Sequence, residues 1–192
     1  MHRHLPTAAL LLLATATAGA QAAAFKLTSP DIPAGGRIDK RFEYNGFGCK
    51  GENKSPALQW SGAPRDTMSY AVTVYDPDAP TGSGWWHWVV VNLPASVTSL
   101  KADAGAPGSF NLPKPAGNVR IDYGVAGFGG VCPPPGDRPH RYIFTVHALS
   151  VDRIEVPVDA TAALAGFMIN SHTIGKASFT ARYGRAKVKG AP

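Results

Sequence analysis

The chain has 192 residues, with 19 Lys and Arg against 13 Asp and Glu, a formal net charge of +6 and 44% hydrophobic residues. This balance supports one hydrophobic core and excludes an intrinsically disordered chain. The 21 Gly and 17 Pro follow no three-residue period, which excludes collagen and disfavours a helical bundle. Two Cys are too few for a disulfide-rich scaffold or a four-cysteine zinc site.

Residues 1–24 have the three regions of a secretory signal peptide. A basic start containing Arg3 precedes the apolar run 5–19, and the small residues that follow allow cleavage after Ala22 or Ala24. An uncleaved membrane anchor is the alternative. No later run is long and apolar enough to span a membrane, so we expect no integral membrane segment once the signal is removed. The sequence thus predicts a periplasmic or secreted protein.

The positive charge is concentrated at the C-terminus. Four of the basic residues are Arg182, Arg185, Lys187 and Lys189, and signal removal would take only Arg3 from the rest. Because the remaining body is nearly neutral, we expect no nucleic-acid groove. Residues 184–192 are interpreted as a basic, solvated tail, with weak attraction to anionic surfaces as the alternative.

Residues 25–183 are expected to form one mainly β domain with few helices. The chain up to Trp60 is expected to form short strands and loops. Turn residues then bound four runs of strand-forming residues. The predicted longer strands cover residues 70–75, 86–93, 140–149 and 177–183.

The second of these strands contains the continuous apolar run Val89-Val90-Val91, so it should be central and covered on both faces. Residues 101–136 contain many Gly and Pro and predict a long loop region, which is often functional in a compact domain. Asp159 is expected to cap a helix over residues 160–169.

Ionisable side chains occur at the ends of the three strongest strands. Asp76 and Asp78 flank Pro77 after the first strand, His87 begins the second, and His140 begins the third, followed by Tyr142. If the strands are neighbours in one sheet, these side chains meet in one pocket. The alternative is structural: two Asp that stabilise a turn and two His that are satisfied polar residues.

Such a pocket would suit an anion. Protonated His rings and a Tyr hydroxyl are donors, and the Gly-rich and Pro-rich loop 129–136 can direct backbone N–H groups at the same anion. Asp76 would then act behind a His, raising the pKa of that ring and fixing its tautomer. Trp85, Trp86 and Trp88 would supply an apolar wall, or else belong to the core. The expected ligand is a phosphate, sulfate or carboxylate, including a head group on an apolar body.

Cys49 and Cys132 form an even pair in a chain predicted to enter an oxidising compartment. One disulfide joining two distant loops is the simplest hypothesis. Two buried free Cys are the alternative, and catalytic thiol chemistry is a third reading.

Four segments, in order and with compatible spacing, resemble the phosphatidylethanolamine-binding protein family, most closely its bacterial branch, often labelled Raf-kinase-inhibitor-like. The resemblance spans nearly all of residues 25–183. The segments are Asn53-x-Ser55-Pro56-x-Leu58-x-Trp60, Asp76-Pro77-Asp78-Ala79-Pro80, Gly84-Trp85-Trp86-His87-Trp88-Val89-Val90-Val91-Asn92-Leu93-Pro94 and Pro133-Pro134-x-Gly136-x3-His140-Arg141-Tyr142.

The resemblance implies an antiparallel β fold with a large central sheet, a small second sheet, few helices and an anion pocket at one end. It implies binding of phosphate-like groups and phospholipid head groups, and some family members inhibit kinases or proteases. Cys132 stands where relatives often carry a small residue, so a disulfide there would stiffen the rim of the pocket. By position, the resemblance assigns ligand binding to Asp76, His87, Gly130, Pro134, His140 and Tyr142.

We therefore expect an exported, non-enzymatic binding protein for a small anion or a phospholipid-like head group, without a cofactor or a bound metal. The alternative is an interaction protein that inhibits an exported protease or another enzyme through loops around the pocket. A hydrolase or metalloenzyme that uses Asp76, His87 and His140 is the third reading. A homodimer is compatible with the sequence, but no motif supports one.

Overall fold

A computed structural model of the protein describes residues 23–187. Nearly all of the expected signal peptide and the last five residues of the basic tail lie outside this range. The described chain is mainly β-structure with few helices, as the sequence predicts. None of its helices is long and apolar enough to cross a membrane.

The described strands form two antiparallel sheets. The large sheet has the order β6-β4-β3-β7-β8, and the small sheet has the order β1-β2-β5. A short 3-10 helix, η1, and one α-helix, α1, complete the fold. The bounds are β1 (Lys26–Thr28), η1 (Lys40–Phe42), β2 (Leu58–Ser61), β3 (Ser69–Asp76), β4 (Trp85–Pro94), β5 (Ser99–Leu100), β6 (Gly117–Asn118), β7 (His140–Leu149), α1 (Ala162–His172) and β8 (Thr173–Tyr183).

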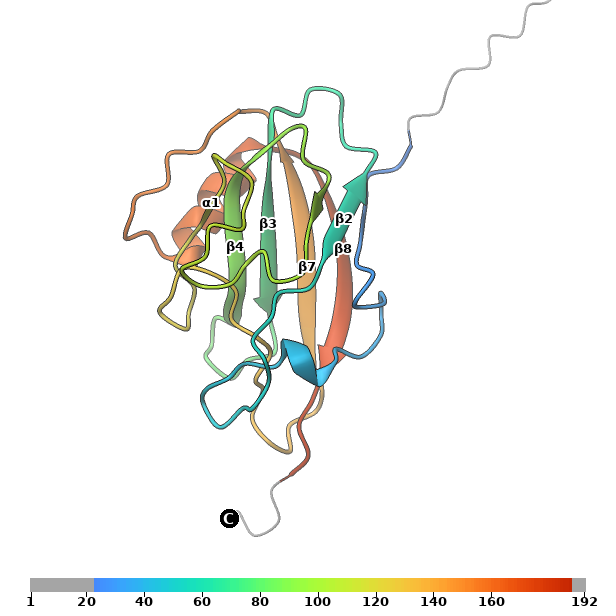
Figure 1. The fold of residues 1–192 in the computed structure, drawn as a ribbon, viewed down its shortest axis with the longest axis vertical. Helices are drawn as coiled ribbons and strands as arrows, with labels where there is room; N and C mark the ends of the chain where they lie inside the picture. The colour runs from blue at the N-terminus through green and yellow to red at the C-terminus, as the bar shows by residue number, and fades with distance from the viewer. Residues whose placement is uncertain (1–22, 188–192) are drawn as a thin grey trace, which may run out of the picture.

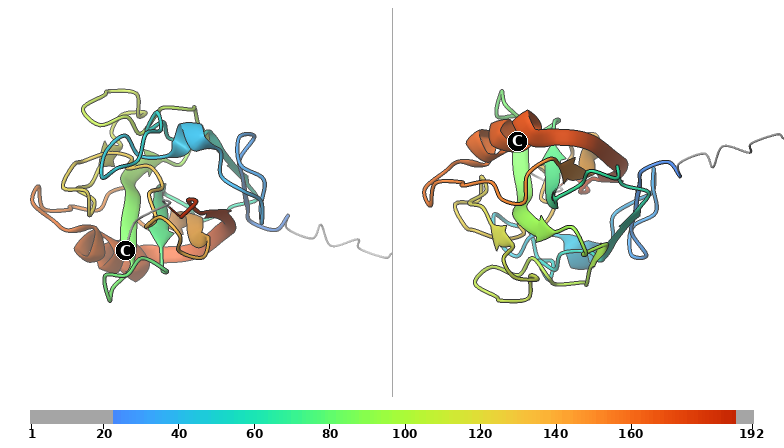
Figure 2. Two further views of the ribbon diagram at one scale, coloured as in Figure 1. Left: turned by 90° about the horizontal axis from the view of Figure 1, so that it is seen from below. Right: turned by 90° about the horizontal axis from the view of Figure 1, so that it is seen from above.

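The large sheet is the middle layer of the molecule. The small sheet lies over one face and α1 over the other, as the two views along the strands show (Figure 2); Figure 1 shows the same layers across the strands. Side chains alternate between the two faces of a strand. In β4, Trp88 and Val90 therefore pack toward the small sheet, while Val89 and Val91 pack toward α1. This confirms that the apolar run in β4 forms a central strand covered on both faces.

The helix begins two residues later than the sequence suggests. Thr161, and not Asp159, is the N-cap, and its Oγ1 accepts the N–H of Leu164. Asp159 lies in the preceding loop, where the N–H of Ala160 already donates to the carbonyl of Pro157. That turn separates Asp159 from the helix, so the cap prediction was wrong although the helix itself was expected.

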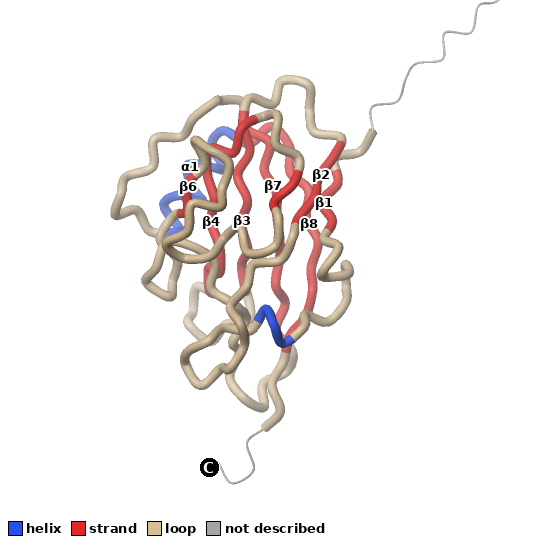
Figure 3. Tube along the Cα trace, viewed as in Figure 1, coloured by secondary structure: helices blue, strands red, loops and turns tan. Residues whose placement is uncertain are grey.

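Antiparallel pairing brings the C-terminal end of β3 and the N-terminal ends of β4 and β7 to the same end of the large sheet. Asp76 pairs with Trp85, and Tyr75 pairs with Ile143 near the start of β7. This end of the sheet is at the bottom of Figures 1 and 3, and long loops together with η1 surround it. The ionisable residues at the strand ends are therefore neighbours in space.

Candidate functional site

A cavity of about 160 Å³ opens at this end of the large sheet. Five of the six residues assigned to ligand binding line it, and Gly130 lies behind the wall. Phe47, Thr81 and Tyr123 also line it, although no motif in the sequence marks them as site residues. The five assigned lining residues are Asp76, His87, Pro134, His140 and Tyr142.

A β-bulge directs His87 into the cavity. Val74 pairs with Trp88 and the next residue of β3, Tyr75, pairs with Trp86, so His87 is an extra residue in β4. Its side chain is 2% exposed, and its Nδ1 donates to the carbonyl of Gly129 at 2.7 Å. Burial lowers the pKa of His87, and the Gly129 carbonyl partly opposes this. The ring is therefore neutral at neutral pH, and Nε2 is the nitrogen without the proton.

His140 lies between two carboxylates. Its Nδ1 is 2.8 Å from Oδ2 of Asp76, and its Nε2 is 3.4 Å from Oδ2 of Asp137. Asp76 is buried with His140, while the side chain of Asp137 is 43% exposed. Both ring nitrogens are thus engaged within the protein. A ligand that binds Nε2 must therefore compete with Asp137 for this nitrogen.

Two hydrogen-bond donors on the cavity wall have no acceptor in the described protein. They are the hydroxyl of Tyr142 and Nε1–H of Trp85. Tyr142 is fully buried, and its ring lies 5.1 Å from that of His87. Burial raises the pKa of Tyr142, and the nearby Asp76 carboxylate raises it further, so the hydroxyl keeps its proton. Asp76 is thus close to this hydroxyl, but it forms no hydrogen bond of good geometry with it. Because an unpaired buried donor costs about 1–3 kcal/mol, these two groups are suited to a ligand that supplies acceptors.

The loop behind the cavity uses its backbone N–H groups within the protein. Gly129 donates to the carbonyl of His87, and Gly130 donates to Oδ1 of Asn53 at 2.7 Å. The carbonyl of Gly130 accepts the hydroxyl of Tyr123 at 3.0 Å. Gly130 therefore positions the cavity wall. The expectation that the N–H groups of Gly129 and Gly130 donate to a ligand was wrong, because both donate within the protein. Asn53, from the first of the four resembling segments, is the residue that fixes this loop.

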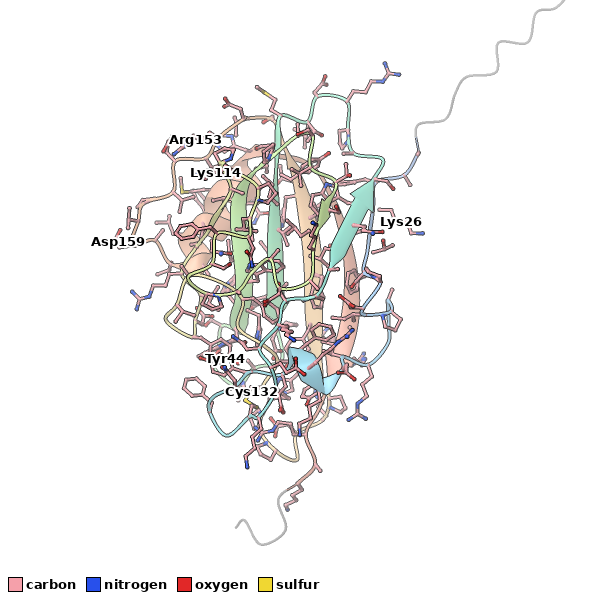
Figure 4. The ribbon with its side chains drawn as sticks, in the orientation of Figure 1. Lys26, Tyr44, Lys114, Cys132, Arg153 and Asp159 are labelled. Atoms are coloured by element: carbon pink, nitrogen blue, oxygen red, sulfur yellow. A yellow bond between two sulfur atoms is a disulfide. The ribbon has the colours of Figure 1, made fainter. Side chains whose placement is uncertain are left out.

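A disulfide joins Cys49 and Cys132 at the cavity rim, as predicted. It holds the loop with Phe47, whose side chain is 72% exposed, against the loop that follows Cys132. Tyr44 stacks on Tyr123 with 4.0 Å between the ring centroids, and Tyr44 and Cys132 both lie at the lower end of the molecule in Figure 4. The rim is thus aromatic and covalently tied.

Only one of the three Trp expected as a wall lines the cavity. Trp85 does so, but Trp86 packs against Tyr75 on the opposite face of the sheet, with 4.7 Å between ring centroids. Trp88 is fully buried in the core, where its Nε1 donates to Asn118. The bulge at His87 separates the three rings, so the predicted three-residue wall was wrong.

Asp78 stabilises the turn after β3. Its carboxylate accepts from Nε and Nη2 of Arg141 at 2.9 and 2.8 Å, and from the backbone N–H of the same residue. The Arg141 guanidinium holds the pKa of Asp78 well below its usual range. The structural reading therefore applies to Asp78, while Asp76 faces the cavity.

Residues 23–187 contain no group of three His, Cys, Asp or Glu side chains placed to hold a metal ion.

Comparison with known proteins supports the resemblance. The family model described as "Phosphatidylethanolamine-binding protein" matches residues 28–184. The Escherichia coli protein "UPF0098 protein YbcL" is 53% identical over 90% of this chain and 94% of its own length. A second Escherichia coli relative, "UPF0098 protein YbhB", is 48% identical over 82% of this chain and 99% of its own length. A crystal structure of YbcL, described there as a new member of the mammalian PEBP family, superposes with a TM-score of 0.82 at 52% identity, covering 84% of this chain and 99% of that one.

Proposed function

Because the chain belongs to the phosphatidylethanolamine-binding protein family, we propose that it is a non-enzymatic binding protein whose cavity takes a small anion or a phosphate-bearing head group. The observation that carries this proposal is the pair of buried donors without acceptors, Tyr142 O–H and Trp85 Nε1–H. Both residues line the same cavity, so an oxyanion bound there can supply the acceptors that these donors lack. No second candidate function has comparable support.

The two His rings have different roles in this proposal. His87 Nε2 carries no proton while the ring is neutral, because Nδ1–H is used on Gly129. It binds a fully ionised oxygen only as an imidazolium, whereas it accepts a hydrogen bond from a protonated phosphate oxygen without charging. His140 and Asp76 also line the cavity, and their buried contact fixes the shape of this part of the wall. Hydrogen phosphate and phosphate esters near their own pKa therefore suit the cavity better than sulfate.

The aromatic rim extends the binding site beyond the anion. Phe47 and Trp85 line the cavity together with Pro80 and Pro134. Apolar side chains of this kind bury the body to which a head group is attached. The proposed ligand class is therefore a phosphate group on an apolar or flat body, and a lipid head group is one member of that class.

We also propose that the protein works outside the cytoplasm. The signal-like sequence of residues 1–24 and the Cys49–Cys132 disulfide support this location. An exported protein would not meet a cytosolic kinase, so kinase inhibition is not transferred from the family label.

Tyr142→Phe tests the proposed function because it removes the hydroxyl, a donor without an acceptor, and keeps the aromatic ring. We expect phosphoethanolamine and phosphate affinity, measured by calorimetry, to fall about tenfold while stability stays unchanged or rises. Tyr123→Phe is the matched control for stability, since it breaks a formed hydrogen bond to Gly130 and should destabilise the fold. If Tyr142→Phe binds phosphoethanolamine and phosphate as tightly as the wild-type protein, the anion does not bind in this cavity. Native mass spectrometry of protein purified from its own compartment then identifies the natural ligand.

A further inference from the structure

A second cavity, of about 520 Å³, lies beside the C-terminal end of β8. It shares no lining residue with the first cavity. Asp137 lines it, and Tyr183, which also lines it, pairs with His140 across β7 and β8. The second cavity therefore lies on the other side of His140.

Positive charge dominates the lining of this second cavity. Arg37, Arg182 and Arg185 contribute to it, against the single carboxylate of Asp137. Arg185 is already engaged, because it donates to the carbonyls of Gly48 and Pro133. Within residues 23–187, no carboxylate lies within 4.0 Å of the guanidinium of Arg37 or Arg182.

The backbone holds these two Arg next to each other. Arg37 and Arg182 are partners in a parallel β-bridge, in which Ile38 N–H donates to the carbonyl of Arg182 at 2.8 Å. The N–H of Arg182 in turn donates to the carbonyl of Gly36. Like charges fixed as neighbours repel each other, and this repulsion is relieved when an anion lies between them.

The phenol of Tyr183 reports the same field. Its hydroxyl donates to Glu43 at 3.1 Å, and burial raises the pKa of Tyr183 to about 12. The positive charges of Arg185 and Arg37 act in the opposite direction on that phenol. Of the two Arg of the bridge, Arg37 therefore acts on the part of the cavity wall that Tyr183 forms.

We propose that the second cavity is a separate anion site that binds a phosphate group through Arg37 and Arg182. Guanidinium groups bind phosphate oxygens with two parallel hydrogen bonds, which favours phosphate over a monovalent ion such as chloride. The cavity is larger than a bare phosphate, so the ligand class is a phosphate monoester or a phosphorylated head group. This site does not depend on the function proposed for the first cavity.

Calorimetric titration with inorganic phosphate at constant ionic strength tests the second site. We expect two equivalents for the wild-type protein and one for Arg37→Gln/Arg182→Gln, with the affinity at the lost site reduced at least about tenfold. Both side chains are exposed, so the double variant should keep the fold, which its melting curve verifies. Arg37→Lys/Arg182→Lys keeps the charge and should weaken binding less, because Lys lacks the two-pronged geometry.

Arg65→Gln/Lys101→Gln is the matched control, because it removes the same charge from two exposed residues outside the cavity. It should retain two equivalents. The proposal is overturned if Arg37→Gln/Arg182→Gln binds like this control. If the wild-type protein binds one equivalent of phosphate, and only Tyr142→Phe loses it, the proposal is also overturned. The first cavity is then the phosphate site. A single equivalent lost only in Arg37→Gln/Arg182→Gln would support it and reject the first site.

Vesicles distinguish the two sources of phosphate. Sedimentation with phosphatidylcholine vesicles containing phosphatidic acid, but not with pure phosphatidylcholine, would assign the second site to a lipid head group if the Arg37→Gln/Arg182→Gln variant fails to sediment. Phosphate binding without sedimentation would assign it to a soluble phosphate monoester. In either case, loss of phosphate binding or of sedimentation in Arg37→Gln/Arg182→Gln would show that Arg37 and Arg182 form the site.

Discussion

Oδ2 of Asp76 lies 2.8 Å from Nδ1 of His140, and both side chains are only 3% exposed. The same carboxylate uses Oδ1 to accept the N–H of Asp78 at 2.8 Å. One buried group therefore joins the end of β3 to the start of β7 and also closes the turn after β3. This contact shapes one wall of the first cavity before any ligand enters.

Asp76→Ala should lower the free energy of unfolding by about 3 kcal/mol, because it leaves a buried ring nitrogen and a backbone N–H without an acceptor. Asp76→Asn keeps an acceptor oxygen and should cost less. Urea denaturation measures both. Asp152→Ala, at an exposed position, is the control and should change stability by no more than about 0.5 kcal/mol. Equal losses in Asp76→Ala and the control would show that the Asp76–His140 contact contributes nothing.

Sulfate affinity should rise as pH falls from about 7.5 to about 5.5, because His87 donates from Nε2 only after it gains a proton. Burial lowers the pKa of His87, so the rise continues below the usual titration range of His. Sulfate is the appropriate probe, since its own charge is constant over this range. Calorimetry at several pH values measures the slope.

His87→Gln should remove most of this pH dependence, and the exposed His172→Gln should retain it. A sulfate affinity that is flat with pH in the wild-type protein would exclude the His87 imidazolium from anion binding.

Cys49→Ser/Cys132→Ser should lower the free energy of unfolding by at most about 4.5 kcal/mol, because the disulfide closes a loop with a sequence separation of 83. The same change releases the loop of Phe47 from the cavity rim, so ligand affinity should also fall. Denaturation and calorimetry of the oxidised, reduced and double-Ser proteins measure the two effects. If the double-Ser protein binds phosphoethanolamine as tightly as the oxidised protein, the rim does not need the covalent tie.

His147 should make the fold acid-sensitive. Burial lowers its pKa to about 4, and its ring contacts the hydroxyls of Thr73 and Thr173. No carboxylate in the described range 23–187 forms an ion pair with it. The unfolded chain therefore binds this proton more readily, and stability is lost as pH falls from about 6.5 to about 4. The difference in unfolding free energy between the wild-type protein and His147→Gln should shrink by about 3 kcal/mol over this range. A constant difference would show that His147 keeps its ordinary titration.

The sequence alone identified the four long strands and the α-helix of this fold, but it missed β6, which lies within the predicted loop region 101–136. Residues 140–149 form a strand with the bounds that their composition predicts, and the apolar run in β4 marks a central strand. These predictions succeed because strand propensity, turn residues and burial on both faces are local properties of the chain. The Cys pair could likewise be inferred from their number and the predicted compartment.

The tertiary structure alone decided how the site is arranged. Alternation along β4 would separate His87 from Trp88, and only the bulge against β3 places both on the inner side while sending Trp86 to the other face. The contact of the Asp76 carboxylate with His140 and the bridge between Arg37 and Arg182 depend on residues far apart in the sequence, which pairing between strands and loops brings together. Register, bulges and counterion geometry arise from contacts between distant segments, so no local pattern in the sequence encodes them.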